Sequence, residues 1–213
     1  METREFYDRI HDSWYNIRHW TLFKKELKEL NERWDGGKLL NVGCAHGADF
    51  APFDEKFEMY GIDVSTKLLR MGQKFSEKLD SRPYLTTADM THLPFKDNTF
   101  DNVICIASLH HLLEEEKRKG ALKQIKRVLK DGNEAFITVW NKWQPQFIFK
   151  GKTIKKEWDY KGKTLERDYY LYTYPEFKKE LEKTDFNVVK IGPESSYDFP
   201  LKYFSKNITA LVK

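Results

Sequence analysis

The chain has 213 residues, of which 40% are hydrophobic and 33% charged, as expected for one ordinary folded domain. This composition excludes a disordered polar tract and a fibrous protein, and the apolar runs are far too short to span a bilayer. The N-terminal segment is charged throughout, which argues against a secretory signal, so we expect a cytoplasmic protein.

Strand-like and helix-like segments alternate along the chain. Residues 1–36 are predicted to be largely helical, from about Arg4 to Trp34, because apolar side chains recur there at helical spacing. Further helices are predicted at 65–79, 114–129 and 174–183. Strands are predicted at seven short apolar runs: 38–42, 59–64, 84–87, 102–107, 134–140, 187–191 and 208–212. Repeated strand–helix–strand units predict a single α/β domain over residues 1–213, with a mostly parallel seven-stranded sheet and helices on both faces.

Two cysteines, Cys44 and Cys105, are too few for a disulfide framework or a four-cysteine zinc site. Both adjoin apolar runs, and we interpret them as buried thiols. The His110–His111 pair has no third ligand at metal-binding spacing, so we expect no metal. The net charge of +4 permits a polyanionic partner without arguing for one.

A glycine-rich turn follows the first predicted strand. In LLNVGCAHGAD, Gly43 and Gly47 leave room for a ligand to approach the backbone. Asp63 follows Gly43 by 20 residues, at the end of the second strand, where a carboxylate can accept both ribose hydroxyls of an adenosine. A tight turn with a helix-capping aspartate explains these residues equally well, so both interpretations stay open at this point.

Motifs further along the chain extend this pattern. Asp89-Met90 follows the third strand, LPFKDNTFD precedes the fourth, and LKDGNEAFITVW leads through the fifth. This ordered set resembles the class I S-adenosylmethionine-dependent methyltransferases over most of Lys38–Trp140. The resemblance implies a Rossmann-like fold with S-adenosylmethionine as cofactor, its methionine end at Gly43–Gly47, its ribose at Asp63 and its adenine at Asp89 and Met90. The full set of implied cofactor contacts is Asn41, Gly43, Cys44, Ala45, Gly47, Asp63, Val64, Asp89, Met90 and Ile106.

Two positions depart from the family pattern. Asn41 stands where the family usually has an acidic residue, and Ala45 stands where it has a glycine. The Asn41 amide still offers hydrogen bonds but removes a charge near the cofactor's ammonium, for which Asp49 is expected to compensate. Ala45 fits the turn if its φ is negative.

Three separate segments resemble a narrower group, the tRNA carboxymethyl-uridine methyltransferases, which form a methyl ester on a modified wobble uridine. They are IASLHH at residues 106–111, YNIRHW at 15–20, and the stretch 158–172 containing RDYYLY. This resemblance implies a tRNA substrate bound through its anticodon region. It also allows for a small zinc-containing activator subunit as a partner.

A carboxylate acceptor makes particular demands on the site. It is already ionised at pH 7, so it needs orientation and loss of its water shell rather than a general base. Arg18, Arg167 and His111 are candidate catalytic residues that hold one carboxylate oxygen, with Tyr169 as a hydrogen-bond donor. The alternative is a solvated helix face for Arg18 and an edge-strand pair for Arg167 and Tyr169. A core or helix-capping position is the alternative for His110.

Residues 141–172 are predicted to form a basic, aromatic insert over the acceptor site. Between Lys142 and Arg167, eight Lys and Arg residues stand against three acidic ones, interleaved with aromatic side chains. Such a segment can contact phosphates and stack on splayed anticodon bases. A basic, solvated hairpin is the alternative. Methylation of a small molecule such as a quinone or carboxylic acid, and a non-enzymatic scaffold that keeps the fold, stay open as alternative functions.

Overall fold

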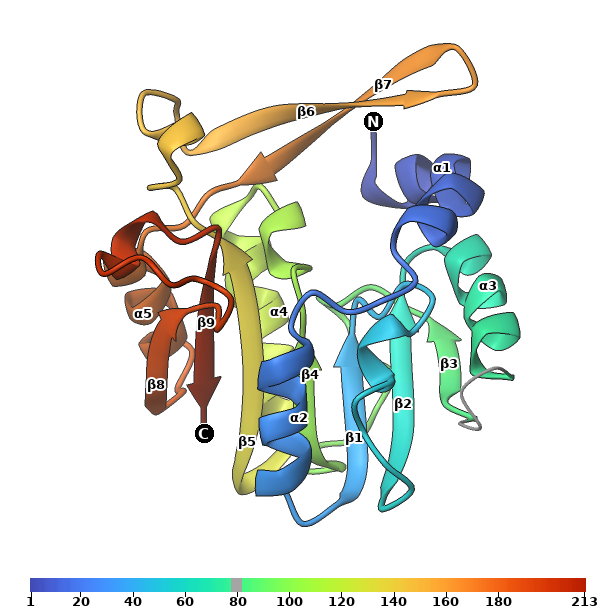
Figure 1. Ribbon diagram of the computed structural model, residues 1–213. Helices are drawn as coiled ribbons and strands as arrows, with labels where there is room; N and C mark the ends of the chain where they lie inside the picture. Colours follow the sequence, from blue (N-terminus) through green and yellow to red (C-terminus); the bar gives the residue numbers. More distant parts are fainter. Residues whose placement is uncertain (78–81) are drawn as a thin grey trace.

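The computed structural model describes residues 1–77 and 82–213 of the chain. Its centre is a seven-stranded sheet with the order β3-β2-β1-β4-β5-β9-β8 (Figure 1). The strands are β1 Gly37–Val42, β2 Phe57–Asp63, β3 Tyr84–Thr87, β4 Phe100–Cys105, β5 Leu129–Trp140, β8 Val188–Pro193 and β9 Asn207–Val212. All seven predicted strands are present, with ends that differ by up to a few residues, and the predicted α/β sheet is confirmed.

Strands β1 to β5 run parallel, whereas β9 runs antiparallel to both of its neighbours. The carboxyl ends of the five parallel strands therefore meet at one edge, at the top of the sheet in Figure 1. Strand β1 lies in the middle, with Asn41 paired with Gly61 of β2 and Ile104 of β4. Ligands of parallel sheets bind beyond this edge, so the loops that follow these strands position the site.

The helices are α1 Thr3–Ile17, α2 Lys24–Arg33, α3 Thr66–Ser76, α4 Glu115–Val128 and α5 Tyr174–Glu182. Helices α4 and α5 pack on the face of the sheet that carries Leu40, and α2 with part of α3 packs on the face that carries Leu39. Both faces of β1 are therefore buried, as expected of a central parallel strand. Ser65 caps α3 as predicted, because its hydroxyl accepts a hydrogen bond from the Leu68 N–H at 3.1 Å. The predicted end of this helix near residue 79 lies outside the described residues.

The N-terminal segment forms two helices rather than one. The segment is largely helical as predicted, but the helical backbone stops at Arg18 and resumes only after Phe23, a break that the prediction did not include. Helix α2 packs on the sheet, whereas α1 packs against α3 and the hairpin described next. The chain must turn between these two surfaces, and the turn brings Arg18 to the site. None of the helices within the described residues is long and apolar enough to cross a membrane.

The segment between β5 and α5 forms a hairpin outside the main sheet. Strands β6 (Thr153–Tyr160) and β7 (Lys163–Tyr170) pair antiparallel and arch over the carboxyl edge of the sheet, next to α1 (Figure 1). Ile154, Leu165 and Tyr169 are buried on its inner side. The backbone is therefore the hairpin of the alternative interpretation, in which aromatic side chains pack on the sheet, and Tyr169 stacks on Trp140 at the end of β5.

Candidate active site

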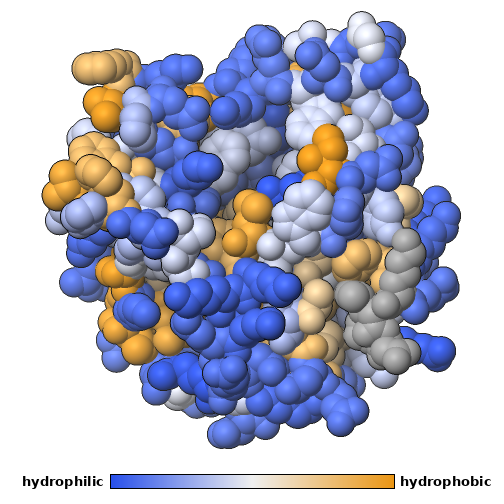
Figure 2. All heavy atoms as spheres, viewed as in Figure 1, coloured by the Kyte–Doolittle hydropathy of each residue, from blue (hydrophilic) through white to orange (hydrophobic). Residues whose placement is uncertain are grey.

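A cavity of about 600 Å³ lies between the carboxyl edge of the sheet and the hairpin. Figure 2 shows the surface hollowed in this region, below the hairpin. Helix α1, the segment that follows it and the hairpin line the cover side of the cavity. Eight of the ten predicted cofactor contacts line the sheet side: Gly43, Cys44, Ala45, Asp63, Val64, Asp89, Met90 and Ile106.

The other two predicted contacts, Asn41 and Gly47, are not part of the cavity wall. Asn41 is fully buried, and neither polar atom of its side chain has a hydrogen-bond partner among the described residues. An orphaned buried amide is costly unless a ligand or a water completes its hydrogen bonds. The Asn41 side chain therefore offers one free amide donor and one free acceptor beneath the glycine-rich turn.

The turn at residues 43–47 has a backbone that favours glycine. Gly43 has a φ of 77°, and a Cβ at this position would overlap the Ser108 hydroxyl. That hydroxyl donates to the Gly43 carbonyl oxygen at 3.1 Å and so ties the turn to the loop after β4. Gly47 has a φ of 85°. The φ of Ala45 is 49°, so the condition of a negative φ is not met, and this conformation costs an L-residue about 1–2 kcal/mol.

Asp63 holds the unfavourable conformation of Ala45 in place. Its Oδ2 accepts the Ala45 N–H at 2.9 Å, and its Oδ1 accepts the Ser65 N–H at 2.8 Å. Burial raises the pKa of Asp63, while these two N–H groups act in the opposite direction. Each oxygen of the carboxylate keeps a second lone pair for another donor. The geometry therefore suits a ligand with two adjacent hydroxyls.

Asp89 is an exposed member of the predicted cofactor set. Its Oδ1 accepts the Thr91 N–H and the Thr91 hydroxyl, both at 2.8 Å, which orients the carboxylate at the cavity wall. Met90 is half-buried beside it. Cys44 and Cys105 are free, buried thiols as predicted, and burial raises the pKa of both.

Arg18 and Asp49 line the cavity near the end of α1. The Arg18 side chain is half-buried, with its guanidinium carbon 5.4 Å from the centroid of the Trp14 ring. Burial lowers the pKa of Arg18 and raises that of Asp49, and the attraction between the two charges opposes both shifts. Arg18 therefore lies on the cavity wall rather than on a solvated helix face.

His111 and Tyr169 line the cavity near the hairpin, as does Tyr7, which sequence analysis missed. The Tyr7 hydroxyl lies 3.1 Å from His111 Nε2, and the His111 and Tyr169 ring centroids are 4.9 Å apart. Tyr7 belongs to the buried stripe of α1. Helical periodicity alone predicts a core residue there, and only the folded chain reveals that its hydroxyl meets His111.

Burial keeps these side chains neutral. It lowers the pKa of His111 well below its ordinary value, raises the pKa of Tyr7 well above its ordinary value, and raises that of Tyr169. His110 is a core residue, because its Nδ1 accepts the Trp140 N–H at 3.2 Å and burial lowers its pKa to about 3. This part of the cavity is thus lined by neutral hydrogen-bonding groups.

Arg167 lies behind this group and is not part of the cavity wall. Its guanidinium donates to the carbonyl oxygen of Thr3 at 3.2 Å and to the Thr3 hydroxyl at 2.7 Å. The guanidinium carbon is 4.8 Å from the centroid of the Tyr7 ring. Arg167 therefore joins the hairpin to α1 and supports Tyr7.

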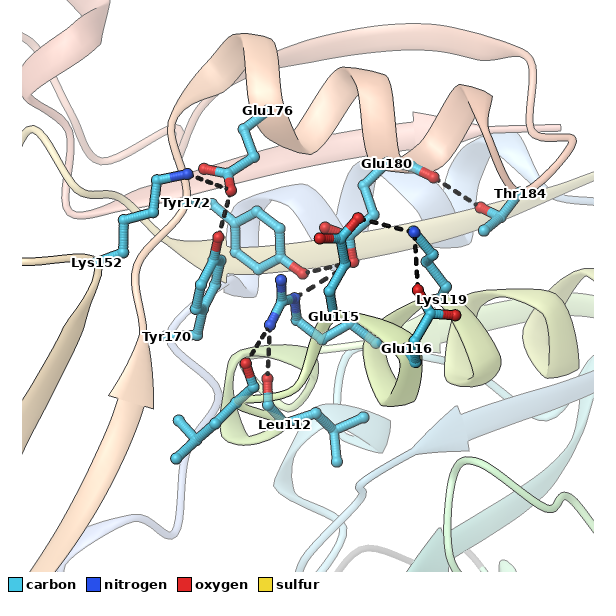
Figure 3. Close-up of polar contacts among 12 residues, drawn as sticks. Leu112, Glu115, Glu116, Lys119, Lys152, Tyr170, Tyr172, Glu176, Glu180 and Thr184 are labelled. Carbon is cyan, nitrogen blue, oxygen red and sulfur yellow. Dashed lines mark hydrogen bonds and ion pairs between the residues drawn. The ribbon is translucent and has the colours of Figure 1, made fainter.

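A second buried arginine anchors the loop that carries His111. Arg118 of α4 donates to the carbonyl oxygens of residues 112 and 113, at 3.3 and 2.6 Å (Figure 3). It also pairs with Glu180 of α5 at 3.3 Å, and its guanidinium carbon stacks 3.6 Å from the centroid of the Tyr170 ring. The cluster therefore fixes the His111 loop and the base of the hairpin to the same pair of helices.

The basic insert is less basic in the fold than in the sequence. Several of its lysines pair with acidic residues, including two that lie outside the insert: the pairs are Lys152–Glu176, Lys155–Glu166 and Lys161–Asp12. Two of its aromatic rings turn inward, since Trp158 lies 5.7 Å from Trp14 and Tyr169 stacks on Trp140 at 4.5 Å. Lys156 lines the cavity.

Comparison with known proteins identifies the central region. Residues 40–137 match the family model described as "Methyltransferase domain". The chain is 32% identical over 124 residues to an Encephalitozoon cuniculi protein whose description names a methyltransferase, covering 58% of this chain and 53% of that protein. It is 32% identical over 105 residues to a tRNA (carboxymethyluridine(34)-5-O)-methyltransferase of Arabidopsis thaliana, covering 49% of this chain and 24% of that protein. The chain thus spans about half of the first relative's length and a quarter of the second's.

Solved structures share nearly the whole fold. An S-adenosylmethionine-dependent methyltransferase from Clostridium acetobutylicum superimposes with a TM-score of 0.74 at 17% identity, covering 98% of this chain and 96% of that one. A complex of the Haloferax volcanii Trm112 methyltransferase activator with a methyltransferase candidate gives 0.70 at 16% identity, covering 99% and 96%. These structures confirm the predicted Rossmann-like fold, and residues 40–137, just under half of the chain, are similar to the methyltransferase domain family.

Proposed function

We propose that this chain uses S-adenosylmethionine to esterify the carboxymethyl group of a modified wobble uridine in tRNA. The products are the methyl ester and S-adenosylhomocysteine. The observation that carries the proposal is one cavity that joins the predicted cofactor residues to the buried group of Tyr7, His111 and Tyr169. The match to a relative described as a tRNA (carboxymethyluridine(34)-5-O)-methyltransferase supports this acceptor over a small molecule.

The sheet side of the cavity fits the cofactor. S-adenosylmethionine supplies an electrophilic methyl group on a sulfonium when it is bound. We assign Asp63 to the ribose, Asp89 to the adenine amine and the turn at 43–47 to the methionine end. The cradle that a side chain at Gly43 would fill, and the orphaned amide of Asn41 beneath it, support this assignment. Asp49 then supplies the negative charge that an amide at position 41 lacks.

The acceptor end suits a group that is already ionised. Because burial lowers the pKa of His111 well below its ordinary value, this imidazole is a poor proton acceptor at neutral pH. The pKa values of Tyr7 and Tyr169 are raised, so their hydroxyls stay protonated. A carboxylate with an ordinary pKa of about 4 needs no proton removed before it attacks the methyl group. Neutral donors can orient such an acceptor without cancelling its charge.

We assign distinct roles to the four predicted catalytic residues. Arg18, a cation at the cavity wall, holds one carboxylate oxygen and leaves the other free to attack. Tyr169 donates a hydrogen bond, and His111 orients the acceptor while Tyr7 fixes its ring. Arg167 is a positioning residue that acts through Tyr7, because its guanidinium bonds to α1 and not to the cavity.

We assign the exposed surface of the basic insert to tRNA. Lys163 is exposed on the hairpin, and Lys150 is exposed in the segment just before it, where the ring of Phe149 is fully exposed. Such cations and rings contact phosphates and stack on unpaired bases. The likeness to the chain in the Trm112 complex supports a small activator protein as a further partner.

The proposal is tested by methyl transfer to tRNA. The protein, alone and with a Trm112 activator, is incubated with labelled S-adenosylmethionine and tRNA whose wobble uridine carries a free carboxymethyl group. We expect alkali-labile label on that nucleoside. Alkali-stable label on a base or a ribose contradicts carboxyl methylation, and label only in free carboxylic acids favours the small-molecule alternative. A protein that gives no calorimetric heat with millimolar S-adenosylmethionine supports the scaffold alternative.

A further inference from the structure

We propose that an apolar groove beside the reaction cavity binds the base of a nucleotide that flanks the modified uridine in a single-stranded RNA segment. The groove encloses about 750 Å³ between residues 144–146, which follow β5, and residues 194–206, which connect β8 to β9. The inference rests on the proposed function, because it takes tRNA as the substrate. It gives the same polymer a second point of attachment outside the reaction cavity.

The groove and the reaction cavity share a wall. Gln144, Gln146 and Lys206 line both hollows. Gln144 is buried, and its Nε2 donates to the carbonyl oxygens of Asn141 at 3.1 Å and Lys206 at 2.9 Å. Its Oε1 accepts a hydrogen bond from Gln146 Nε2 at 2.9 Å. The shared wall is thus a fixed polar ridge. An RNA strand that occupies the cavity would cross this ridge to enter the groove.

Aromatic rings line the groove beyond this ridge. They belong to Tyr197, Phe199 and Phe204, and the Phe199 side chain is 58% exposed. The Tyr197 hydroxyl donates to the Leu201 carbonyl oxygen at 3.0 Å, which fixes its ring at 6.4 Å from the ring of Phe199. Figure 2 shows apolar side chains on the left flank of the molecule, where Figure 1 places these connecting segments. An exposed ring such as that of Phe199 can stack on any base, because every base has a π-face.

The charges of the groove are compatible with a phosphate nearby. The Glu194 carboxylate is directed into the backbone, where it accepts the N–H groups of Lys206 at 3.0 Å and Asn207 at 2.7 Å, and the residue is 5% exposed. Lys206 is exposed at the shared wall, and Lys202 is exposed in the same connection. Exposed Asp198 offsets one of these charges. Stacking therefore contributes most of the binding, and the lysines add a salt-dependent part.

Continuity with the reaction cavity decides the kind of ligand. A wobble uridine in the cavity remains joined to its neighbours through phosphates, so the next nucleotide must lie just outside the cavity. The ridge of Gln144, Gln146 and Lys206 is an exit that leads directly to exposed rings. A protein segment would use the same rings without needing this connection to the cavity. The shared wall therefore favours single-stranded RNA.

The test measures RNA binding without methyl transfer. Fluorescence anisotropy with labelled hexauridylate compares the wild-type protein with Phe199→Ala and with Tyr84→Ala. Tyr84 is a matched control, because it is 60% exposed on edge strand β3 at the other side of the sheet and lines neither hollow. We expect Phe199→Ala to weaken binding about tenfold and Tyr84→Ala to weaken it less than twofold. Lys206→Gln should reduce the dependence of affinity on salt.

Several results would overturn the inference. They are wild-type protein that does not bind hexauridylate, equal affinity of the wild type and Phe199→Ala, and an equal loss in Tyr84→Ala. Equal affinity is also the result expected if the groove binds a protein segment. Unchanged melting temperature and S-adenosylhomocysteine affinity show that Phe199→Ala is folded. Failure of the proposed function looks different: wild-type protein binds hexauridylate through Phe199 but transfers no methyl group to tRNA.

Discussion

The two sides of the reaction cavity are built in different ways. The sheet side consists of turns at strand ends, held by backbone hydrogen bonds such as those that Asp63 accepts from Ala45 and Ser65. The cover side consists of α1, the segment after it and the hairpin, held by side-chain contacts such as that between Arg167 and Thr3, 164 residues apart. The first kind of site follows from the ends of neighbouring strands, whereas the second requires segments from the two ends of the chain to meet.

This difference explains what sequence analysis could predict. Asp63 was located from its spacing after Gly43 and Asp89 from the family resemblance, and both lie at strand ends, which converge at one edge of a parallel sheet. The break in the helix at Arg18 was not predicted, because it depends on α1 and α2 packing against different surfaces. Tyr7 was missed for the same reason. The positive φ of Ala45 was also missed, because the hydrogen bond that holds it comes from a residue 18 positions away.

The largest expected effect on stability is at the buried Arg118–Glu180 ion pair, which fixes the His111 loop and the base of the hairpin to the same helices. Arg118→Met should lower the free energy of unfolding by about 3–5 kcal/mol, because it leaves the Glu180 carboxylate buried and unpaired. Urea unfolding measures this change. The double variant Arg118→Met/Glu180→Leu removes both charges and should recover most of the loss. If the double variant is as unstable as the single one, the unpaired Glu180 carboxylate is not the cause of the lost stability.

The buried His110, next to His111, predicts how the stability of the protein depends on pH. Its pKa is about 3 in the folded chain, against about 6.5 when unfolded, so its contribution to stability is complete above pH 6.5 and is lost as the pH falls toward 3. The slope is about 1.4 kcal/mol per pH unit, or about 2 kcal/mol between pH 6.5 and 4.5. His110→Asn keeps an acceptor for the Trp140 N–H and should lose less stability over this range. Parallel pH profiles for the two proteins would refute this explanation.

A smaller effect is expected at Tyr7, where a substitution should change catalysis without changing cofactor binding. Tyr7→Phe removes the hydrogen bond to His111, worth about 0.5–1.5 kcal/mol, and should lower the kcat for tRNA about two- to tenfold. The affinity for S-adenosylhomocysteine should stay the same. Tyr15→Phe is the control, since it makes the same substitution in the same helix away from the cavity wall. An equal loss of cofactor affinity in Tyr7→Phe would show that the two sides do not act separately.

The most direct test of the account is calorimetric binding of S-adenosylhomocysteine to the wild-type protein and to Asp63→Asn. The wild type should bind one molecule per chain. Asp63→Asn should bind roughly 10- to 150-fold more weakly, because a charged hydrogen-bond acceptor for the ribose is lost, a difference of about 1.5–3 kcal/mol. Equal affinity of the two proteins, or no heat from the wild type at millimolar ligand, would contradict a cofactor site at the carboxyl edge of the sheet.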